Sequence, residues 1–463
     1  MYDAPLLCAL TELAGRRGVS RFHMPGHKGR AAGSIFETVF PVDYTELPAT
    51  GNLYEENGPI ALAEQRAAQW YGMDGCFFLT CGATQGLKAA LHTCCAPGSA
   101  VVLDRNCHKS VLDACAQINL LPQYIYPRFS PETGVTGDID VQAFASLLQQ
   151  SGARTAVITS PTYYGRCLNV AQLAAAAHDC GCRLIVDSAH GSHLRACGSA
   201  DAALLGADIV IFSAHKTLSA AGQGAYLAFR GLNSVQRQQL RENCALYGTT
   251  SPSYIIMASL DFARARMELD NGLWQYTAQQ SLALRRCIEE QTPFRCLAAE
   301  DPCRLTVLTK PAGISGFETA ERLFALGAEP EMQDDGRVVF ILSAQDTQED
   351  RARLLQALQA AAAGPPKRPV SPGELPLPPQ PEAVLTPAQA LFAPKELRPL
   401  RECQGCVAGQ HLAPYPPGVA AVVMGESLTK FCVEYLLKKG YNEDTYIRTI
   451  NNAVLPRHFE RRI

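Results

Sequence analysis

Lys216 follows directly after an apolar segment, residues 208–212, and a short Ser-Ala-His turn. The apolar segment is typical of a buried β-strand, and an ammonium group is costly to bury at such a position. In open α/β sheets, ligands usually lie at the carboxyl ends of the strands. A desolvated amine there loses its proton more easily and can condense with an aldehyde cofactor. The competing interpretation is a surface lysine that begins a loop, and Lys216 alone does not decide between the two.

Asp187 ends the preceding apolar segment, residues 183–187. If the two segments form neighbouring parallel strands, this carboxylate and the amine of Lys216 meet at one edge of the sheet. Pyridoxal phosphate (PLP) is an aldehyde that requires a carboxylate against its pyridine nitrogen, because the protonated ring then accepts electrons. Asp187 could instead cap the turn that follows. Taken together, the two residues predict a PLP site.

Two more turns carry residues that suit such a site. Gly82, Ala83 and Thr84 lie between a short apolar run and a helical segment, where small residues let backbone N–H groups and a hydroxyl approach a phosphate. His108 lies in a later turn, where an imidazole can stack on a flat cofactor ring. Glycine-rich turns and polar strand-end histidines are both common without a ligand. These residues support the prediction only in company with Asp187 and Lys216.

The elements that must position these residues alternate between helix-like and strand-like segments from about residue 61 to residue 230. The strand segments are continuous apolar runs, which predicts an α/β fold with parallel strands and helices on both faces. After residue 364 the chain is rich in proline, which favours an extended connector. We expect an N-terminal segment (1–60), a large PLP-binding domain (61–290), a smaller α/β domain (291–363), a proline-rich linker (364–384) and a C-terminal domain (385–463).

The composition narrows the class of protein. The 463-residue chain has a formal net charge of −3, which gives no electrostatic reason to expect nucleic acid or an anionic membrane as a partner. No apolar run approaches the roughly 20 residues that span a bilayer, and the N-terminus does not resemble a secretory signal. A cytoplasmic location is therefore expected.

Cysteine usage agrees with that location. The 18 cysteines are scattered through apolar segments, as reduced and mostly buried thiols are. Cys403 and Cys406 have the spacing of half a zinc site, but no second pair of suitable spacing accompanies them. We therefore expect two thiols in a loop and no metal.

Over nearly its whole length the chain resembles the PLP-dependent ornithine/lysine/arginine decarboxylases, which have the aspartate-aminotransferase fold (fold type I). The matching segments are Arg21–Gly29, Asp104–Ser110, Ser160–Gly165, Ser213–Lys216, and Pro414–Gly418 followed by Gly425 and Glu426. The length is similar to the short form found in many Gram-positive bacteria, which lacks the N-terminal receiver-like domain of longer members. The resemblance also implies a homodimer or a higher homo-oligomer, with the active site at the subunit boundary.

The resemblance implies a role for each matching residue. Lys216 would hold PLP, Asp187 would face the pyridine nitrogen and His108 would stack on the ring. The remaining cofactor-binding residues would be Gly82, Ala83 (through its backbone), Thr84, Ser213, His215 and His190, with the role of His190 left open.

The implied reaction is decarboxylation of a basic amino acid, with arginine expected first, lysine second, and ornithine still open. His215 or Lys216 would return a proton to Cα. A carboxylate should meet the cationic end of the substrate, because burying that charge alone costs several kcal/mol. Glu426 is the first candidate, and the N-terminal segment offers Asp43 and Glu46.

Two alternatives remain open. One is an aminotransferase or a lyase on the same fold, and the other is a non-catalytic PLP-binding protein. An aminotransferase clamps the substrate carboxylate with arginine. Arg337 could be such a clamp, but we interpret it as an ordinary charge at the start of a strand.

Overall fold

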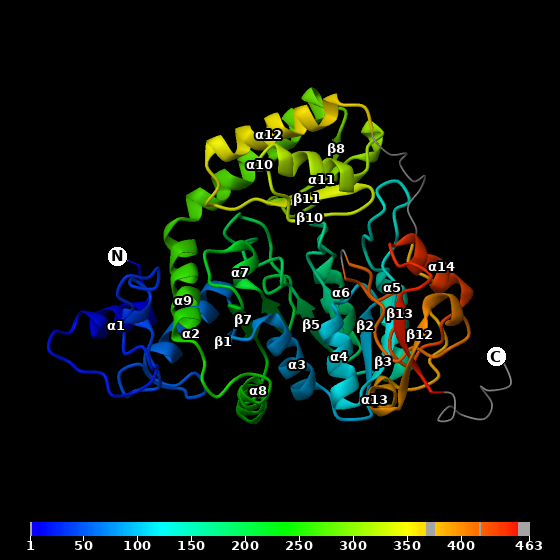
Figure 1. Cartoon of the computed structure of the whole chain (residues 1–463). Coiled ribbons are helices and arrows are strands. Elements are labelled where there is room, and N and C mark those ends of the chain that lie inside the picture. The colour runs from blue at the N-terminus through cyan, green and yellow to red at the C-terminus, as the bar shows by residue number, and fades with distance from the viewer. Residues whose placement is uncertain (1, 367–375, 416–417, 452–463) are drawn as a thin grey trace.

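The computed structural model of this chain describes residues 2–366, 376–415 and 418–451, and Figure 1 shows how its elements are arranged. A large sheet with its helices occupies the centre of the view, and a smaller sheet with its helices lies above it. The C-terminal unit lies at one side of the large sheet, and α1 (Pro5–Gly15) with the rest of the N-terminal segment lies at the other side. Parts of the predicted linker and C-terminal domain, and Pro416 and Pro417 of the predicted proline-rich motif, fall outside the described residues.

Seven strands form the large sheet, in the order β1-β7-β6-β5-β4-β2-β3. The central strands are buried on both faces, which explains why their sequences are continuous apolar runs. The strands are β1 (Gly75–Leu79), β2 (Ala100–Asp104), β3 (Leu121–Ile125), β4 (Thr155–Thr159), β5 (Arg183–Asp187), β6 (Ile209–Phe212) and β7 (Ala225–Phe229).

The direction of β7 corrects one expectation, because the sequence predicts parallel strands throughout. β7 pairs antiparallel with both β6 and β1. A parallel strand needs a crossover, usually an α-helix that carries the chain back to the starting edge of the sheet. The connection from β6 to β7 contains only the four-residue helix α7 (Ala214–Thr217), so the chain returns alongside β6 in the opposite direction. β5 and β6 do pair in parallel, so the two predicted site residues follow neighbouring strands.

Helices cover both faces of the large sheet, and each face has its own apolar core. One face carries α3 (Gly82–Cys94), α4 (Lys109–Ile118) and α8 (Ser234–Leu246). The other carries α2 (Gly58–Tyr71), α5 (Val141–Ser151), α6 (Val170–Asp179) and α9 (Tyr254–Leu269). Within the described residues, no helix combines the length and the hydropathy that crossing a membrane would require.

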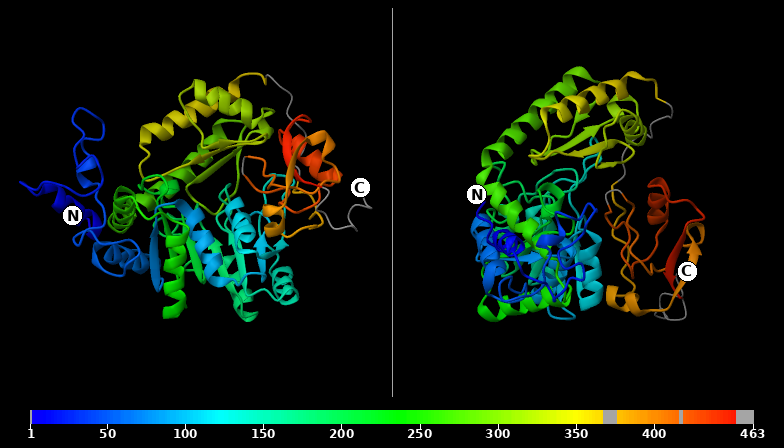
Figure 2. Two further views of the ribbon diagram at one scale, coloured as in Figure 1. Left: turned by 60° about the horizontal axis from the view of Figure 1, so that its bottom comes forward. Right: turned by 60° about the vertical axis from the view of Figure 1, so that its left-hand side comes forward.

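The small unit is an antiparallel sheet in the order β10-β11-β9-β8 with three helices packed on it. Helix α9 leads out of the large unit into α10, as Figure 1 and the right-hand view of Figure 2 show. The strands are β8 (Arg295–Cys296), β9 (Arg304–Leu308), β10 (Met332–Gln333) and β11 (Arg337–Ile341), and the helices are α10 (Asn271–Gln291), α11 (Gly316–Ala325) and α12 (Gln348–Ala363).

The C-terminal unit has a small apolar core of its own. Its described residues form a two-stranded antiparallel sheet and two α-helices, one of which packs on α4 of the large unit. Its elements are α13 (Pro387–Phe392), β12 (Lys395–Pro399), α14 (Lys430–Lys438) and β13 (Tyr446–Ile450).

Candidate active site

A cavity of about 620 Å³ opens at the carboxyl ends of the strands of the large sheet. Residues at the ends of β4, β5 and β6 line its floor, the small unit contributes Glu331, and the C-terminal unit contributes a wall that includes Tyr415 and Val419. The structure brings all nine predicted cofactor residues to this cavity: Gly82, Ala83, Thr84, His108, Asp187, His190, Ser213, His215 and Lys216.

Lys216 projects into the cavity from α7, one turn beyond the end of β6. Burial lowers the pKa of its ammonium group from the usual value, which favours the neutral, nucleophilic amine. Its Nζ lies 3.1 Å from Nε2 of His190. The position and the lowered pKa together suit a lysine that must condense with an aldehyde.

A hydrogen-bonded chain behind Lys216 fixes the tautomer of His190. The guanidinium of Arg304, on β9 of the small unit, donates to Nδ1 of His190 at 2.7 Å. Burial and the positive charges of Lys216 and Arg304 lower the pKa of His190 well below its usual range, so its ring is neutral. Since Nδ1 accepts from Arg304, the ring proton is on Nε2, where it can be donated to the lysine amine. His190 therefore lies between Arg304 and Lys216, in contact with both.

Asp187 closes β5 and is buried at the floor of the cavity. Its Oδ1 accepts a hydrogen bond from the backbone N–H of Ala189 at 3.2 Å, which holds the side chain at the turn. Burial raises the pKa of this carboxyl group, and the nearby Lys216 and His108 act in the opposite direction. A cationic pyridinium placed against Asp187 would likewise stabilise the charged carboxylate and offset the cost of burying it.

His108 is the N-cap residue of α4. Its Nδ1 accepts from the backbone N–H of Ser110 at 3.2 Å, so the neutral ring carries its proton on Nε2. Burial lowers the pKa of His108, which favours that neutral form. The backbone of His108 also forms an isolated antiparallel bridge with Val419, which brings the C-terminal unit over the cavity.

The turn before α3 provides a place for a phosphate group. Gly82 has a φ of +76°, and a Cβ at this position would meet no atom within 4 Å, so the backbone is bare on the side of the cavity. Ala83 and Thr84 follow in the first turn of α3, whose N–H groups have no acceptor within the helix. With the amine of Lys216 and the carboxylate of Asp187 in the same cavity, these residues fit PLP.

The structure corrects the prediction that Glu426 meets the substrate. Glu426 does not line the cavity, and both of its carboxylate oxygens accept hydrogen bonds of 2.8 Å from the guanidinium of Arg105. The backbone N–H of Val423 donates to the same carboxylate at 2.7 Å. Because both carboxylate oxygens are engaged in a buried ion pair, Glu426 joins the C-terminal unit to the end of β2 instead.

The other predicted substrate carboxylates do not reach the cavity of their own chain either. Asp43 lies 3.1 Å from Nε2 of His27 within the N-terminal segment, and neither it nor Glu46 lines the cavity. Whether they serve a neighbouring subunit stays a prediction. Arg337 is also occupied, since it pairs with Asp334 at 2.8 Å and so is not poised as a substrate clamp.

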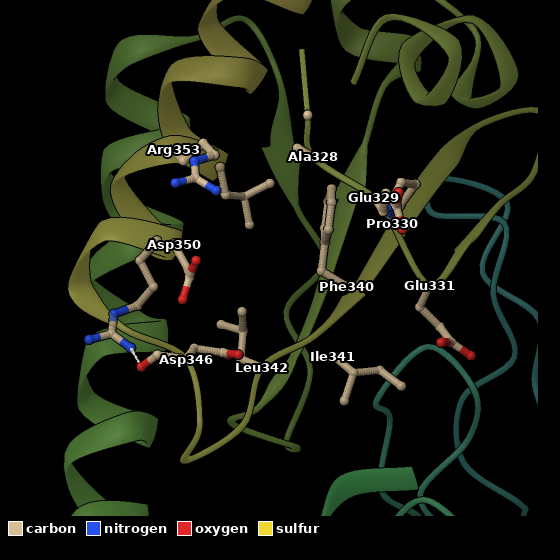
Figure 3. A pocket seen from close by; sticks show the side chains of 13 residues that line it. Ala328, Glu329, Pro330, Glu331, Phe340, Ile341, Leu342, Asp346, Asp350 and Arg353 are labelled. Atoms are coloured by element: carbon tan, nitrogen blue, oxygen red, sulfur yellow. Dashed lines mark hydrogen bonds between the residues drawn. The ribbon is translucent and has the colours of Figure 1, made fainter. Parts of the chain in front are cut away.

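Sequence reasoning missed Glu331, a second carboxylate that lines the cavity besides Asp187. It precedes β10 in the small unit and accepts a hydrogen bond of 2.7 Å from the hydroxyl of Tyr163. In Figure 3 its side chain points away from Asp346 and Asp350. No local pattern marks Glu331, because its place at the cavity depends on how the small unit packs on the large one.

Figure 3 shows a second cavity, of about 440 Å³, within the small unit. It lies between β11 and α12, and its polar lining includes Asp346, Asp350 and Arg353. None of the nine cofactor residues lines it. It therefore has no part in holding PLP.

Cys403 and Cys406 are buried thiols in the C-terminal unit. Their sulfurs lie 3.2 Å and 3.7 Å from the backbone oxygens of Pro399 and Glu402. These contacts are those expected of two structural thiols.

Comparisons with known proteins agree with this geometry. The family model "Orn/Lys/Arg decarboxylase, major domain" matches residues 4–300. The chain is 32% identical over 453 residues to the uncharacterized protein YaaO of Bacillus subtilis and 28% identical over 462 residues to the arginine decarboxylase of the same organism, and each match covers 94% of both proteins. It is 30% identical over 322 residues to the lysine decarboxylase LdcA of Pseudomonas aeruginosa, a match that covers 61% of this chain and 43% of that protein.

Solved structures show the same fold. The lysine decarboxylase LdcF of Francisella novicida aligns with a TM-score of 0.82 at 20% identity and covers 97% of this chain and 81% of its own. A structure of SPT with PLP aligns with a TM-score of 0.55 at 15% identity and covers 78% of this chain and 84% of its own. The family match, the shared fold and the cavity around Lys216 lead to one conclusion: the chain belongs to the Orn/Lys/Arg decarboxylase family and is a PLP-dependent amino-acid decarboxylase of fold type I.

Proposed function

We propose that this chain removes the α-carboxylate of a basic amino acid as carbon dioxide and releases the corresponding amine. Arginine is the first expected substrate, followed by lysine and ornithine. The observation that carries the proposal is the gathering of Lys216, Asp187 and His108 around one cavity with a carboxylate, Glu331, in its lining. The nearly full-length match to a protein named arginine decarboxylase supports the choice of arginine.

Each site residue has a defined task in this reaction. PLP, when bound, supplies a sink for the electrons released as the bond to the carboxylate breaks. Asp187 keeps a proton on the pyridine nitrogen, and His108 offers the flat face of a neutral ring. Lys216, whose pKa is lowered by burial and whose Nζ contacts His190, anchors the aldehyde and exchanges places with the substrate amine. Lys216 and His215 both line the cavity, and either can return the proton to Cα.

The charges of the cavity favour loss of the carboxylate over its retention. Among the described residues that line the cavity there is no arginine. Arg304 lies behind the lining, is fully buried and donates to His190. A carboxylate that is not clamped by arginine is poorly solvated and gains stability by leaving as neutral carbon dioxide. This arrangement favours a decarboxylase over an aminotransferase on the same fold.

Glu331 is the carboxylate that we assign to the cationic end of the substrate. It is exposed at the cavity, where it can exchange water for a guanidinium or an ammonium group. The hydroxyl of Tyr163 donates to it and so orients the carboxylate. Pairing of this kind lowers the cost of enclosing a charged side chain.

One assay tests the reaction. The purified enzyme with PLP should release carbon dioxide and an amine from arginine, lysine or ornithine without any keto acid. A strict requirement for a keto-acid acceptor would show an aminotransferase instead. Ammonia and a keto acid as products would show a lyase, and PLP binding without any turnover of the three amino acids would favour a non-catalytic protein.

A second assay tests the assignment of Glu331. We expect Glu331→Gln to raise KM for the preferred basic substrate roughly tenfold, about 1.4 kcal/mol of binding, because the cationic end loses its counter-charge. The kcat and the visible absorbance of bound PLP should change little. The matched control is Glu329→Gln, which alters a carboxylate that lines only the small-unit cavity. Equal KM values for the wild type and both variants would remove Glu331 from the substrate site.

The active assembly is proposed to be a homodimer or larger, located in the cytoplasm. Apolar side chains of the N-terminal segment support a second copy of the chain as the partner, since Phe22 and Ile35 are 93% and 87% exposed. All 18 cysteines are free thiols in the structure, as a reducing compartment would keep them.

A further inference from the structure

A cluster of metal-ligand side chains lies outside the cavity that holds PLP. His193, Cys197 and Cys303 each offer one ligand atom, and these three atoms lie within 4.8 Å of one another. Two residues are fully buried, and Cys197 is partly exposed. The reaction proposed above uses none of them.

The hydrogen bonds of His193 resemble those of a metal-binding histidine. Its Nε2 lies 2.8 Å from Oδ1 of the buried carboxylate of Asp301. The same oxygen accepts from the backbone N–H of Cys303 at 2.9 Å, which fixes the carboxylate in place. The other ring nitrogen, Nδ1, is buried and makes no hydrogen bond with the described residues. A carboxylate that orients one ring nitrogen while the other is left for a cation is the usual support of a zinc-bound histidine.

The spacing of the sulfurs fits a tetrahedral ion. The Sγ atoms of Cys197 and Cys303 are 3.7 Å apart. With Zn–S bonds of about 2.3 Å, a tetrahedral zinc places two sulfurs about 3.8 Å apart. Two thiolates and an imidazole are soft and borderline ligands, a set that selects zinc over magnesium or calcium.

Local backbone structure brings the ligands together. His193 and Cys197 are one turn apart in the segment after β5, and the N–H of Cys197 donates to the carbonyl of His193 at 3.1 Å. Their side chains therefore lie on the same side of that turn. Cys303 comes from the small unit, directly before β9.

We propose that His193, Cys197 and Cys303 bind one Zn²⁺ ion, with Asp301 supporting the histidine and a water molecule as the fourth ligand. Three protein ligands and a solvent molecule are a known zinc coordination set. Cys197 is the one partly exposed member of the three, so the cluster is not wholly closed to solvent. The expectation that the chain has no metal rested on Cys403 and Cys406, and this site uses neither.

The ion would tie the large unit to the small unit behind the active site. Cys303 precedes Arg304, whose guanidinium donates to His190, and His190 contacts the amine of Lys216. Zinc at this position would hold β9 at the distance that this chain of contacts requires. The zinc is therefore a positioning element for Lys216 rather than a participant in the reaction.

Metal analysis of the intact enzyme tests the proposal. The enzyme is produced with PLP and added zinc sulfate and is then dialysed into metal-free buffer. It should contain about one zinc per chain by elemental mass spectrometry. Cys197→Ser should lose most of this zinc and still fold, because the residue is small and partly exposed. Cobalt loaded in place of zinc should give red-light absorption bands typical of tetrahedral thiolate coordination, which bound PLP does not produce.

The control variant is Cys180→Ser, which changes an equally exposed thiol outside the cluster and should keep the full zinc content. His193→Gln provides a second test, since it removes the imidazole and leaves both thiols. Zinc well below one per chain in the loaded wild type would overturn the proposal. So would full zinc content in both Cys197→Ser and His193→Gln, or an intact mass showing a disulfide between Cys197 and Cys303 in place of the ion.

Discussion

Asp187 is the residue whose charge matters most to the proposed reaction. Asp187→Asn should still bind PLP on Lys216, and borohydride reduction should recover the label on the Lys216 peptide. Turnover should fall by roughly a hundredfold or more, because the neutral amide no longer stabilises a protonated pyridine ring in a buried site. The measurements are kcat and peptide mapping, with the exposed Asp179→Asn as control. A kcat near that of the wild type, with PLP bound, would contradict the role given to Asp187.

Asp104, at the end of β2, gives a prediction for the cofactor-free protein. The pKa of Asp104 is raised to about 7, chiefly by burial and to a lesser extent by the charge of Asp187, although hydrogen bonds from two backbone N–H groups act against this. The folded protein therefore holds the Asp104 proton more tightly than the unfolded chain does. The resulting stabilisation is complete below the ordinary pKa of about 4 and is lost as the pH rises through 7.

Asp104→Asn should remove this dependence. Between pH 5 and pH 8 the free energy of unfolding of the wild type should fall relative to the variant by on the order of 2 kcal/mol. Urea unfolding of the cofactor-free proteins at several pH values measures the difference. The exposed Asp138→Asn should run parallel to the wild type. A constant gap between wild type and Asp104→Asn across this range would show that Asp104 does not titrate there.

The residues of the cofactor site could be predicted because each follows an apolar run, which is a signal within a few positions of the chain. The role of Glu426, in contrast, could not be predicted from neighbouring residues in the sequence. Its partner Arg105 is 321 positions away, and a carboxylate among glycine and apolar residues has the same local pattern whether it meets a substrate or an arginine. Glu331 and the cluster around His193 likewise depend on contacts between units that no local pattern records.

Among the elements, the strands of the large sheet could be located closely, since β2, β4, β5 and β7 each have an apolar centre and occupy the predicted segments. Their directions were harder to predict. The reversed β7 depends on what fills the connection after β6, and that connection must hold Lys216 rather than a crossover helix. At this point the chain carries a site residue where a regular fold would carry a crossover helix. The pattern of apolar residues does not reveal this difference.

The pair Arg105–Glu426 gives a prediction at this scale, since it joins β2 to the C-terminal unit. Both side chains are almost fully buried. Glu426→Gln should lower the stability of the attachment by about 3–5 kcal/mol, because it leaves the guanidinium without a counter-charge. Thermal unfolding should show a transition at a lower temperature, while KM for the amino acid in the folded enzyme stays the same.

The double variant Arg105→Met with Glu426→Leu is the matched comparison. It removes both charges, so it should recover much of the loss. If Glu426→Gln raised KM without changing the unfolding temperature, the original prediction of a substrate role for Glu426 would be restored.

At the scale of the whole molecule, the N-terminal segment predicts self-association. Its side chains Phe22 and Ile35 are the two most exposed large hydrophobic residues of the described chain. Light scattering should therefore show at least a dimer at micromolar concentration, because large apolar side chains exposed to this extent are costly to leave in water.

Substitution by serine at both positions should shift the assembly toward monomers. The control is Leu204→Ser, which changes a side chain that is 64% exposed on the large unit. A wild-type monomer, or a dimer that is unaffected by the double substitution, would exclude this segment as the contact surface.

The wall that the C-terminal unit gives to the PLP cavity has a consequence for how the enzyme is made. A ribosome completes the large sheet well before it reaches Tyr415, Val419 and Glu426. Until then Arg105 lacks its counter-charge and the cavity lacks one side. We therefore expect the unfinished chain to bind the cofactor less tightly than the complete enzyme. Cofactor binding would then follow the synthesis of the C-terminal unit, which carries Glu426.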